Sequence, residues 1–457
     1  MISFDSTADF RSQRLLKKYI RAETSPATQI ALKGLLHCGE ATLPILAQPA
    51  AFIVRYSQEG EENSKTTSAI RGVITCSSIW SCPVCAVHEM ARRGARIAAA
   101  IDALSTLYKQ SAAMFTFTIP HRKSQPLSEV FDILQATWRR FIKSSKTSKK
   151  RKYTRKDTGE NVIYEIQNSE FCRLRSTHDN VYSVRVYEVT YGKAYGWHPH
   201  IHALYWFPNE KFNSITERED QIAKYWHSCA RAEYLKYYRA RKDTMFNGDD
   251  AAVIKFVDNV FRPGEIEQHF GFYISKNLDG TPRKVTSSVY FSGWSGDSEL
   301  TKVTLKKARD GHYSVFQLLD EAKAAKTWDD AKPWLALFTE YACATRGHRR
   351  INWSRPNPNK IIDAWIKEHG DPLITKKKDI PPVKRTVVYW FDADEWYTVV
   401  HFDKICSEDI DLVSLILERA RLPDASEQID KLLLSLGLCG LMKWHPHPEQ
   451  SRYEYAA

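Results

Sequence analysis

The chain has 457 residues, of which 43% are hydrophobic, and its 66 Lys and Arg residues outnumber 54 Asp and Glu by 12. This length predicts two to four domains, at roughly 150 residues per domain. No run of about 18 apolar residues is present, which excludes a transmembrane helix, and the first residues lack the pattern of a signal peptide. We therefore expect a cytoplasmic protein with no membrane partner and with reduced or metal-bound cysteines. The positive balance favours a polyanionic partner, although it is also typical of a mildly basic globular protein.

The first predicted elements surround a group of cysteines. Residues 52–54 and 72–74 predict two short strands around a polar turn, and Val87 to Tyr108 predicts a helix rich in Ala and Arg. The alternation from Met114 to Ile119 predicts a strand. Leu127 to Ile142 then has the apolar spacing of an amphipathic helix.

Three of the cysteines have the spacing of a metal site. Cys82 and Cys85 flank a Pro-Val turn that presents two thiolates to one metal ion, and Cys76 supplies a third. The fourth ligand of this metal could be either Cys38 or His88, and the spacing does not decide between them. Structural Zn²⁺ suits such a set, whereas buried thiols and a redox pair are the alternatives; a redox pair would need neither Cys76 nor Cys38.

A polar, basic stretch from residue 143 to residue 152 follows the amphipathic helix. Such a run is typical of a solvated loop, and the alternative is an arm that contacts DNA. The residues of this predicted DNA contact are Lys149, Lys150, Arg151 and Lys152.

The most informative segment carries three histidines at alternating positions, His198, His200 and His202. It lies in a predicted hairpin whose strands span 181–190 and 201–207. His200 and His202 face the same side of a strand, and the pairing places Glu188 roughly opposite His200. Two imidazoles and a carboxylate suit Mg²⁺ or Mn²⁺ with positions left for a phosphate oxygen. The alternatives are histidines without a metal, or a Zn²⁺ hydrolase, although the H-E-x-x-H pattern is absent.

A second candidate group lies in a predicted helix from Gly264 to Leu278. On a helix His269, Tyr273 and Lys276 are each one turn apart. The Tyr273 hydroxyl could act as a nucleophile while Lys276 lowers its pKa or holds a phosphate. Taken alone, the Tyr-x-x-Lys pattern is more typical of core packing.

The remaining predicted elements are mainly helical. They are a long helix over 215–241, a linker over 375–385, a strand near 386–389, and helices around 412–419 and 429–436.

The histidine strand followed by Tyr-x-x-Lys resembles the HUH endonucleases, and more closely the rolling-circle plasmid replication initiators (Rep proteins). Met114 to His121 is similar to the first motif of this family, and Gly196 to Leu204 is similar to its metal motif. Two further blocks are similar to downstream motifs of the family and follow in the same order. The first runs from residues 299–302 through residues 314–319, and the second spans residues 347–354. The resemblance runs from about Cys38 to about Trp353.

This resemblance implies an α+β fold. Its HUH nuclease core has a central antiparallel sheet covered by helices, between a zinc-bearing N-terminal part and a mostly helical C-terminal part. The expected regions are 1–110 for zinc binding, 111–310 for the HUH endonuclease domain, and 311–457 for DNA binding or oligomerisation. The resemblance also favours Cys38 as the fourth zinc ligand.

The implied activity is metal-dependent, site-specific nicking and rejoining of single-stranded or hairpin origin DNA. Tyr273 would form a 5′-phosphotyrosine and leave a 3′-OH primer, with Mg²⁺ or Mn²⁺ on Glu188, His200 and His202. Lys276 would steady the phosphate or the phenolate. The implied partners are origin DNA and the host helicase and polymerase.

One departure from the family concerns termination. Relatives with a single catalytic Tyr often carry a Glu four residues before it, where this chain has His269, which could be a general base. Two other functions stay open: an HUH transposase or relaxase, and a non-enzymatic, zinc-stabilised DNA-binding regulator. The residues do not indicate the origin sequence or the oligomeric state.

Overall fold

The computed structural model combines helices with antiparallel sheets, which confirms the predicted α+β class. It describes residues 9–40, 51–58, 66–143, 149–154, 161–166, 182–208, 219–241, 246, 249–260, 272–274, 312–354, 358–370, 383–400, 402 and 412–442. None of the helices in these ranges is long and apolar enough to cross a bilayer.

The chain divides into two compact units, each assembled from separate stretches of sequence. The first unit comprises Met1–Arg92, Phe316–Arg346 and Leu373–Ala457, and the second comprises Arg93–Val315 and Gly347–Pro372. The three functional regions expected from the sequence stay a prediction.

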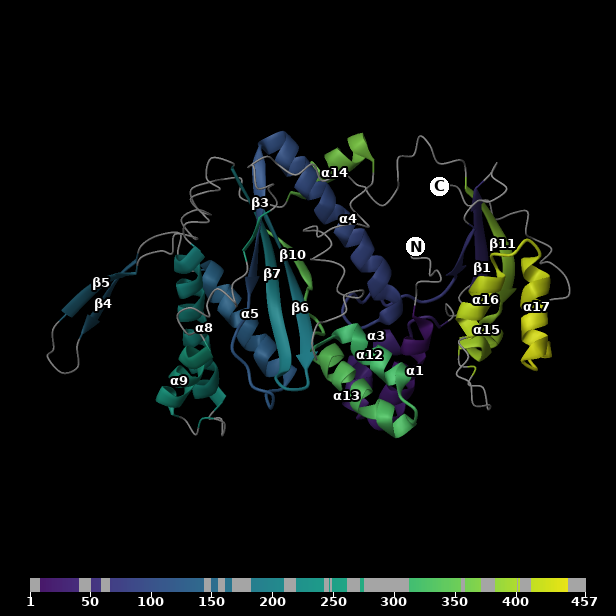
Figure 1. The fold of residues 1–457 in the computed structure, drawn as a ribbon, viewed down its shortest axis with the longest axis horizontal. Helices are drawn as coiled ribbons and strands as arrows, with labels where there is room; N and C mark the ends of the chain where they lie inside the picture. The colour runs from purple at the N-terminus through teal and green to yellow at the C-terminus, as the bar shows by residue number, and fades with distance from the viewer. Residues whose placement is uncertain are drawn as a thin grey trace. The chain divides into compact units, whose positions relative to one another are not determined.

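The second unit is built on an antiparallel sheet with the histidine strand at its centre (Figure 1). The strand order is β10-β6-β7-β3-β8, and β9 also pairs with β6. The strands are β3 (Gln110–Phe117), β6 (Ser183–Gly192), β7 (Gly196–Pro208), β8 (Phe272–Ile274), β9 (His312–Ser314) and β10 (Ile351–Trp353). The predicted strand from Met114 and the predicted hairpin are therefore confirmed as β3 and β6–β7.

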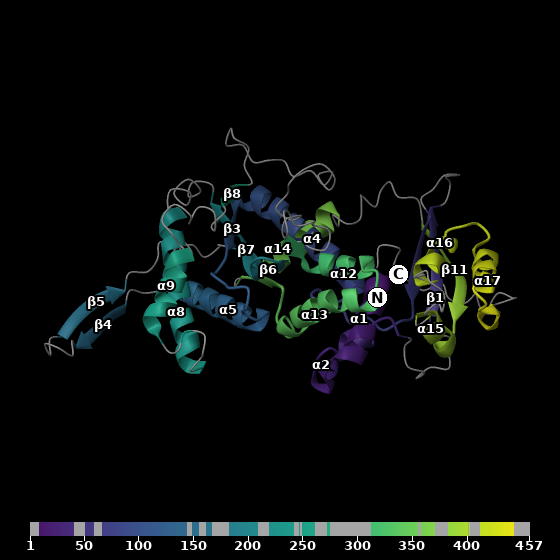
Figure 2. The ribbon, with the colours of Figure 1, turned by 60° about the horizontal axis from the view of Figure 1, so that its bottom comes forward.

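Helices cover one face of this sheet. Figures 1 and 2 show α5 (Leu127–Lys143) between the sheet and α8 (Glu219–Arg241), both as predicted from the apolar spacing. The ring of Phe117 on β3 lies 5.3 Å from that of Trp138 on α5 and 4.8 Å from that of Trp226 on α8. Phe117 pairs with Ile201, so Ile201 faces the helices, and the histidines on either side of it belong to the opposite face. The other helices of this unit are α9 (Asp250–Val260) and α14 (Asn359–His369).

The predicted helix from Gly264 to Leu278 is wrong where the structure describes it. Residues Phe272–Ile274 form β8, which pairs with β3 so that Tyr273 lies opposite Met114. Aromatic and β-branched residues favour strands, and β3 offers backbone groups that need a partner. The helical spacing of Tyr273 with its neighbours therefore does not apply. His269 and Lys276 lie outside the described residues.

The loop predicted for the basic stretch is also wrong over its last four residues. These residues belong to β4 (Lys149–Thr154), which pairs with β5 (Asn161–Ile166) in a separate two-stranded sheet. The register places Lys150 opposite Glu165. Whether this hairpin contacts DNA stays a prediction.

The first unit contains a three-stranded antiparallel sheet of order β11-β1-β2. Its strand β1 (Ala51–Gln58) contains the predicted strand at 52–54 and pairs with β2 (Thr67–Arg71). Because β2 ends at Arg71, the predicted strand at 72–74 is wrong. β11 (Val383–Phe391) begins inside the predicted linker. The helices are α1 (Phe10–Glu23), α2 (Pro26–Ala31), α3 (Lys33–Leu36), α12 (Val315–Ala324), α13 (Trp328–Ala344), α15 (Ala393–Val400), α16 (Leu412–Arg419) and α17 (Ala425–Ser435), with a 3₁₀ turn, η4 (Cys439–Leu441). The long helix α4 (Pro83–Tyr108) contributes residues to both units.

The start of β7 depends on a glycine. Gly196 has φ +79°, and a Cβ there would lie 2.8 Å from Lys123 Cα and 2.9 Å from Lys123 O. Gly347 has a similar φ of +78° but nothing within 4 Å of the added Cβ. We expect Gly347→Ala to lower the free energy of unfolding by about 1–2 kcal/mol, from the left-handed backbone alone. Gly196→Ala should lower it by about 2–5 kcal/mol, because the backbone clash adds to that effect.

Urea denaturation of the two variants, followed by circular dichroism, measures this difference. Equal losses would show that the hairpin moves away from Lys123 without a penalty.

Candidate metal centres

Two groups of side chains in the described part of the chain could hold a metal ion. One consists of Glu188, His200 and His202, all buried, and the other of four cysteines. Within each group the ligand atoms lie within 4.8 Å of one another. The first group stands on β6 and β7 of the second unit, where the register places Glu188 directly opposite His200, as the sequence predicts.

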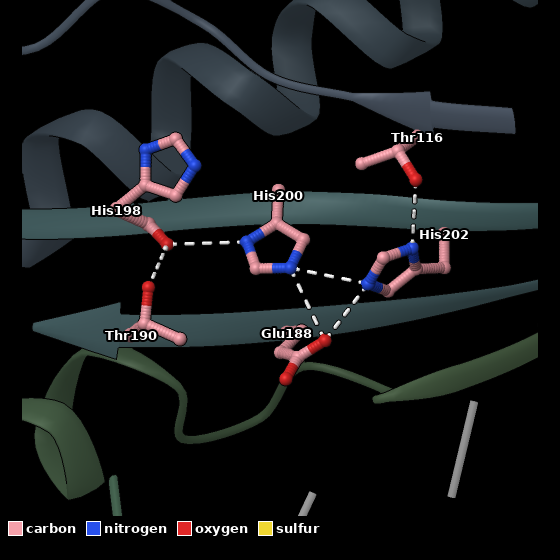
Figure 3. Close-up of polar contacts among 6 residues, drawn as sticks. All are labelled: Thr116, Glu188, Thr190, His198, His200 and His202. Carbon is pink, nitrogen blue, oxygen red and sulfur yellow. Dashed lines mark hydrogen bonds and ion pairs between the residues drawn. The ribbon is translucent and has the colours of Figure 1, made fainter. Parts of the chain in front are cut away.

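The three ligand atoms of the first group converge on one point (Figure 3). The Oε2 atom of Glu188 lies 3.1 Å from His200 Nε2 and 2.8 Å from His202 Nε2, and the two Nε2 atoms are 3.1 Å apart. An octahedral ion with ligands at about 2.1 Å separates neighbouring ligands by about 3.0 Å, whereas tetrahedral zinc separates them by about 3.4 Å. The residues therefore fit three adjacent positions of an octahedral divalent cation.

Neighbouring oxygen atoms fix the orientation of both imidazoles. The carbonyl of His198 can only accept a hydrogen bond, so the Nδ1 atom of His200, 3.3 Å away, carries the proton. The Nε2 atom of His200 is thereby turned towards Glu188, where it can bind a cation. The Nδ1 atom of His202 lies 3.0 Å from the hydroxyl of Thr116 on β3 (Figure 3). Thr116 is a residue of this site that the sequence analysis missed, because only the pairing of β3 with β7 brings it to His202.

The carboxyl group of Glu188 is held in its ionised form. Burial by itself raises its pKa, but hydrogen bonds and charges from His200 and His202 outweigh burial and keep the pKa well below the ordinary value. An ionised carboxylate between two imidazoles is the form that binds a cation.

Tyr273 lies on β8, at the edge of the sheet that carries the histidines. It pairs with Met114, which pairs with Leu204, two residues along β7 from His202. One strand, β3, therefore separates the backbone of Tyr273 from the histidine strand. With strands about 4.8 Å apart, Tyr273 stands about 10 Å across the sheet from β7.

A second pair of imidazoles extends the first group towards the hairpin tip. The Nε2 atom of His121 lies 2.8 Å from Nδ1 of His198, and its Nδ1 atom donates to the carbonyl of Tyr195 at 3.1 Å. The ring of His198 is centred 5.3 Å from that of His200. The sequence analysis gave these two residues no role, although the alternation of a strand already places His198 on the face of His200.

The four cysteines form a group in the first unit in which three are buried and Cys76 is partly buried. The group contains Cys38, Cys76, Cys82 and Cys85. Of the two candidates for the fourth ligand, the structure therefore brings Cys38, and not His88, to the other three cysteines. The sulfur of Cys38 lies 3.4 Å from that of Cys85 and 3.6 Å from that of Cys82. Four thiolates at about 2.3 Å from a tetrahedral zinc ion stand about 3.8 Å apart, so the residues fit such an ion.

Polar contacts from α1 reach this cysteine group. Gln13 donates from Nε2 to the sulfur of Cys82 at 3.3 Å, and the buried ammonium of Lys17 donates to the carbonyl of Cys38. Hydrogen bonds from Cys76 and the other two thiols lower the pKa of Cys38. The same contact with Cys38 raises the pKa of Cys76, and burial raises that of Cys82. Without a cation the four thiols can share only part of the negative charge that a metal would stabilise.

The chain is similar to a curated protein named "Protein rep" from Streptomyces lividans, with 28% identity over 320 residues. The match covers 63% of this chain and 64% of that protein, slightly less than two thirds of its length. The chain is also 35% identical over 140 residues to a "Neomycin resistance protein" from Streptomyces cyanogenus, which covers 29% of this chain and 30% of that protein. No family model and no solved structure matches the chain.

The cysteine group makes a direct prediction about metal content. Purified Cys38→Ser protein should lose the metal that wild type retains through dialysis against a mild chelator, because three thiolates hold the ion less tightly. His88→Ala should retain it. Inductively coupled plasma mass spectrometry measures the content, and Cys439→Ser, which changes an exposed thiol, is the matched control. Metal loss in His88→Ala together with retention in Cys38→Ser would contradict the assignment.

Proposed function

We propose that the chain is a plasmid replication protein of the HUH type that nicks and rejoins single-stranded origin DNA. The observation that carries this proposal is the convergence of Glu188, His200 and His202 on the central strands of the sheet. The name of the Streptomyces lividans relative supports a role in plasmid replication. The resemblance of the motifs to rolling-circle initiators supports the nicking activity.

Glu188, His200 and His202 would hold Mg²⁺ or Mn²⁺, because their spacing fits an octahedral ion. When bound, such an ion supplies Lewis-acid polarisation of a phosphate oxygen. Thr116 and the carbonyl of His198 keep the two imidazoles aligned during the reaction.

Tyr273 is the proposed nucleophile. Its hydroxyl oxygen forms a bond to phosphorus while the bond from phosphorus to the 3′ oxygen breaks. The phenolic proton is released, and the departing oxygen takes up a proton to become the 3′-OH primer. The 5′-phosphotyrosine conserves the energy of the broken bond, so the strand can be rejoined. The pairing of β8 supports this role, since it brings the backbone of Tyr273 into the same sheet as the histidine strand, with only β3 between them.

Several finer assignments belong to the same proposal. Lys276 would steady the phosphate, His269 could act as a general base at termination, and residues 149–152 of β4 would contact DNA. The cysteine group would bind structural Zn²⁺. Origin DNA and the host helicase and polymerase are the proposed partners, in the cytoplasm. The proposed regions are 1–110 for zinc, 111–310 for the nuclease, and 311–457 for DNA binding or oligomerisation.

A covalent adduct tests the proposal. Wild-type protein incubated with origin-bearing single-stranded DNA and Mn²⁺ should give a protein–DNA band that survives denaturation. We expect no adduct from Tyr273→Phe, which lacks the hydroxyl, and a loss of at least about 100-fold in rate from His202→Ala. Excess EDTA should abolish the reaction, and added Mn²⁺ should restore it. Tyr397→Phe, which removes an exposed hydroxyl on α15, should react like wild type.

The outcomes separate the competing functions. An adduct that persists in Tyr273→Phe would move the nucleophile to another Tyr. Sequence-specific DNA binding with no adduct under any metal would favour the zinc-stabilised regulator. A transposase or relaxase would form the same adduct but on DNA from a transposon end or a transfer origin.

A further inference from the structure

Two exposed rings meet at the tip of the β6–β7 hairpin, one from the turn of the hairpin and one from the neighbouring strand β9. Tyr195, in the turn, is 63% exposed. Its ring stacks with that of the exposed His312 on β9, with planes 12° apart and centroids separated by 6.1 Å. Large exposed aromatic side chains that are held parallel are suited to binding another flat ring.

A glycine makes this arrangement possible. The register places Gly192 opposite His312, and a Cβ on Gly192 would lie 3.2 Å from Nδ1 of His312 and 3.7 Å from Cδ2 of Tyr195. Both rings therefore lie over the backbone of Gly192. Alternation along β6 puts this position on the same face as Glu188.

The rings lie at a short distance from the metal ligands along the sheet. Gly192 is four residues beyond Glu188 on β6, which corresponds to about 14 Å at 3.4 Å per residue. His198, paired with His121, occupies the level between them. The sheet face thus presents the metal ligands, an imidazole pair and a stacked ring pair in one line.

Positive charge borders the same tip. Lys193 and Lys123 are exposed, and the backbone of Lys123 lies against Gly196. The Nζ atom of Lys193 stands 5.6 Å from the centre of the Tyr313 ring on β9. Cations beside stacking rings are the combination that binds single-stranded nucleic acid.

We propose that Tyr195 and His312 form a stacking platform for one unpaired DNA base, a few nucleotides from the phosphate held at the metal centre. The lysines at the tip attract the neighbouring phosphates. A base within a duplex already has both faces stacked, so the platform selects single-stranded or unwound DNA. This inference rests on the proposed function, which supplies the DNA substrate.

Binding of a labelled oligonucleotide tests the platform. The probe is an oligothymidylate of about 16 nucleotides with one 2-aminopurine, whose fluorescence is quenched on stacking, in EDTA and at fixed salt. We expect Tyr195→Ala to weaken binding roughly 5- to 100-fold and to remove the quenching. His312→Ala should also weaken binding and reduce the quenching. Tyr195→Trp should keep both the binding affinity and the quenching of wild type.

Matched controls keep the result specific. Tyr397→Ala removes a ring that is 59% exposed in the other unit and should bind like wild type. Circular dichroism should show that Tyr195→Ala remains folded, since the side chain is mostly exposed. The platform is overturned if Tyr195→Ala binds the probe and quenches it like wild type.

The two proposals can fail separately. If Tyr195→Ala is unchanged in binding while wild type still forms the tyrosyl adduct, the platform alone is wrong. If wild type neither binds the probe nor forms the adduct, both are wrong.

Discussion

The pairing register of β6 with β7 is the constraint on which the rest of the second unit depends. It places Glu188 opposite His200, and it places Ile201 on the other face, against Phe117 and the helices. A slip of one residue would turn both histidines towards the apolar helices and Ile201 towards the carboxylate. Burial of Ile201 and the turn at Gly196 therefore fix the positions of the candidate metal ligands as well as those of the core residues.

The two faces of this sheet are stabilised in different ways. The helix-covered face is stabilised by packed aromatic rings, which need no polar partners. The opposite face buries a carboxylate and two imidazoles, and burying such groups is unfavourable unless they are paired. Their mutual contacts, with Thr116 and the His198 carbonyl behind them, satisfy these groups and hold them ready for a cation.

Local patterns were readable from the sequence, and contacts between distant segments were not. The alternation and turn glycines predicted the hairpin and hence Glu188 beside His200, while the cysteine spacing predicted three of the four thiols. Thr116 and His121 could not be assigned, because their roles arise from β3 lying next to β7. Tyr273 was placed on a helix because its segment has helical spacing, whereas pairing with the β3 edge decides its conformation.

The charges of the two ligand sets argue for different roles. Four thiolates around Zn²⁺ leave two negative charges in excess, which repel a phosphate backbone, and the buried ammonium of Lys17 beside Cys38 offsets part of that excess. One carboxylate and two neutral imidazoles around a divalent cation leave a positive excess, which attracts phosphate. The cysteine group is therefore suited to holding the first unit together, and the histidine group is suited to contact with an anionic ligand. In the proposed function, the excess positive charge of the whole chain adds to the attraction along the DNA backbone, while the position of the proposed cut depends on the sheet face that carries the histidines.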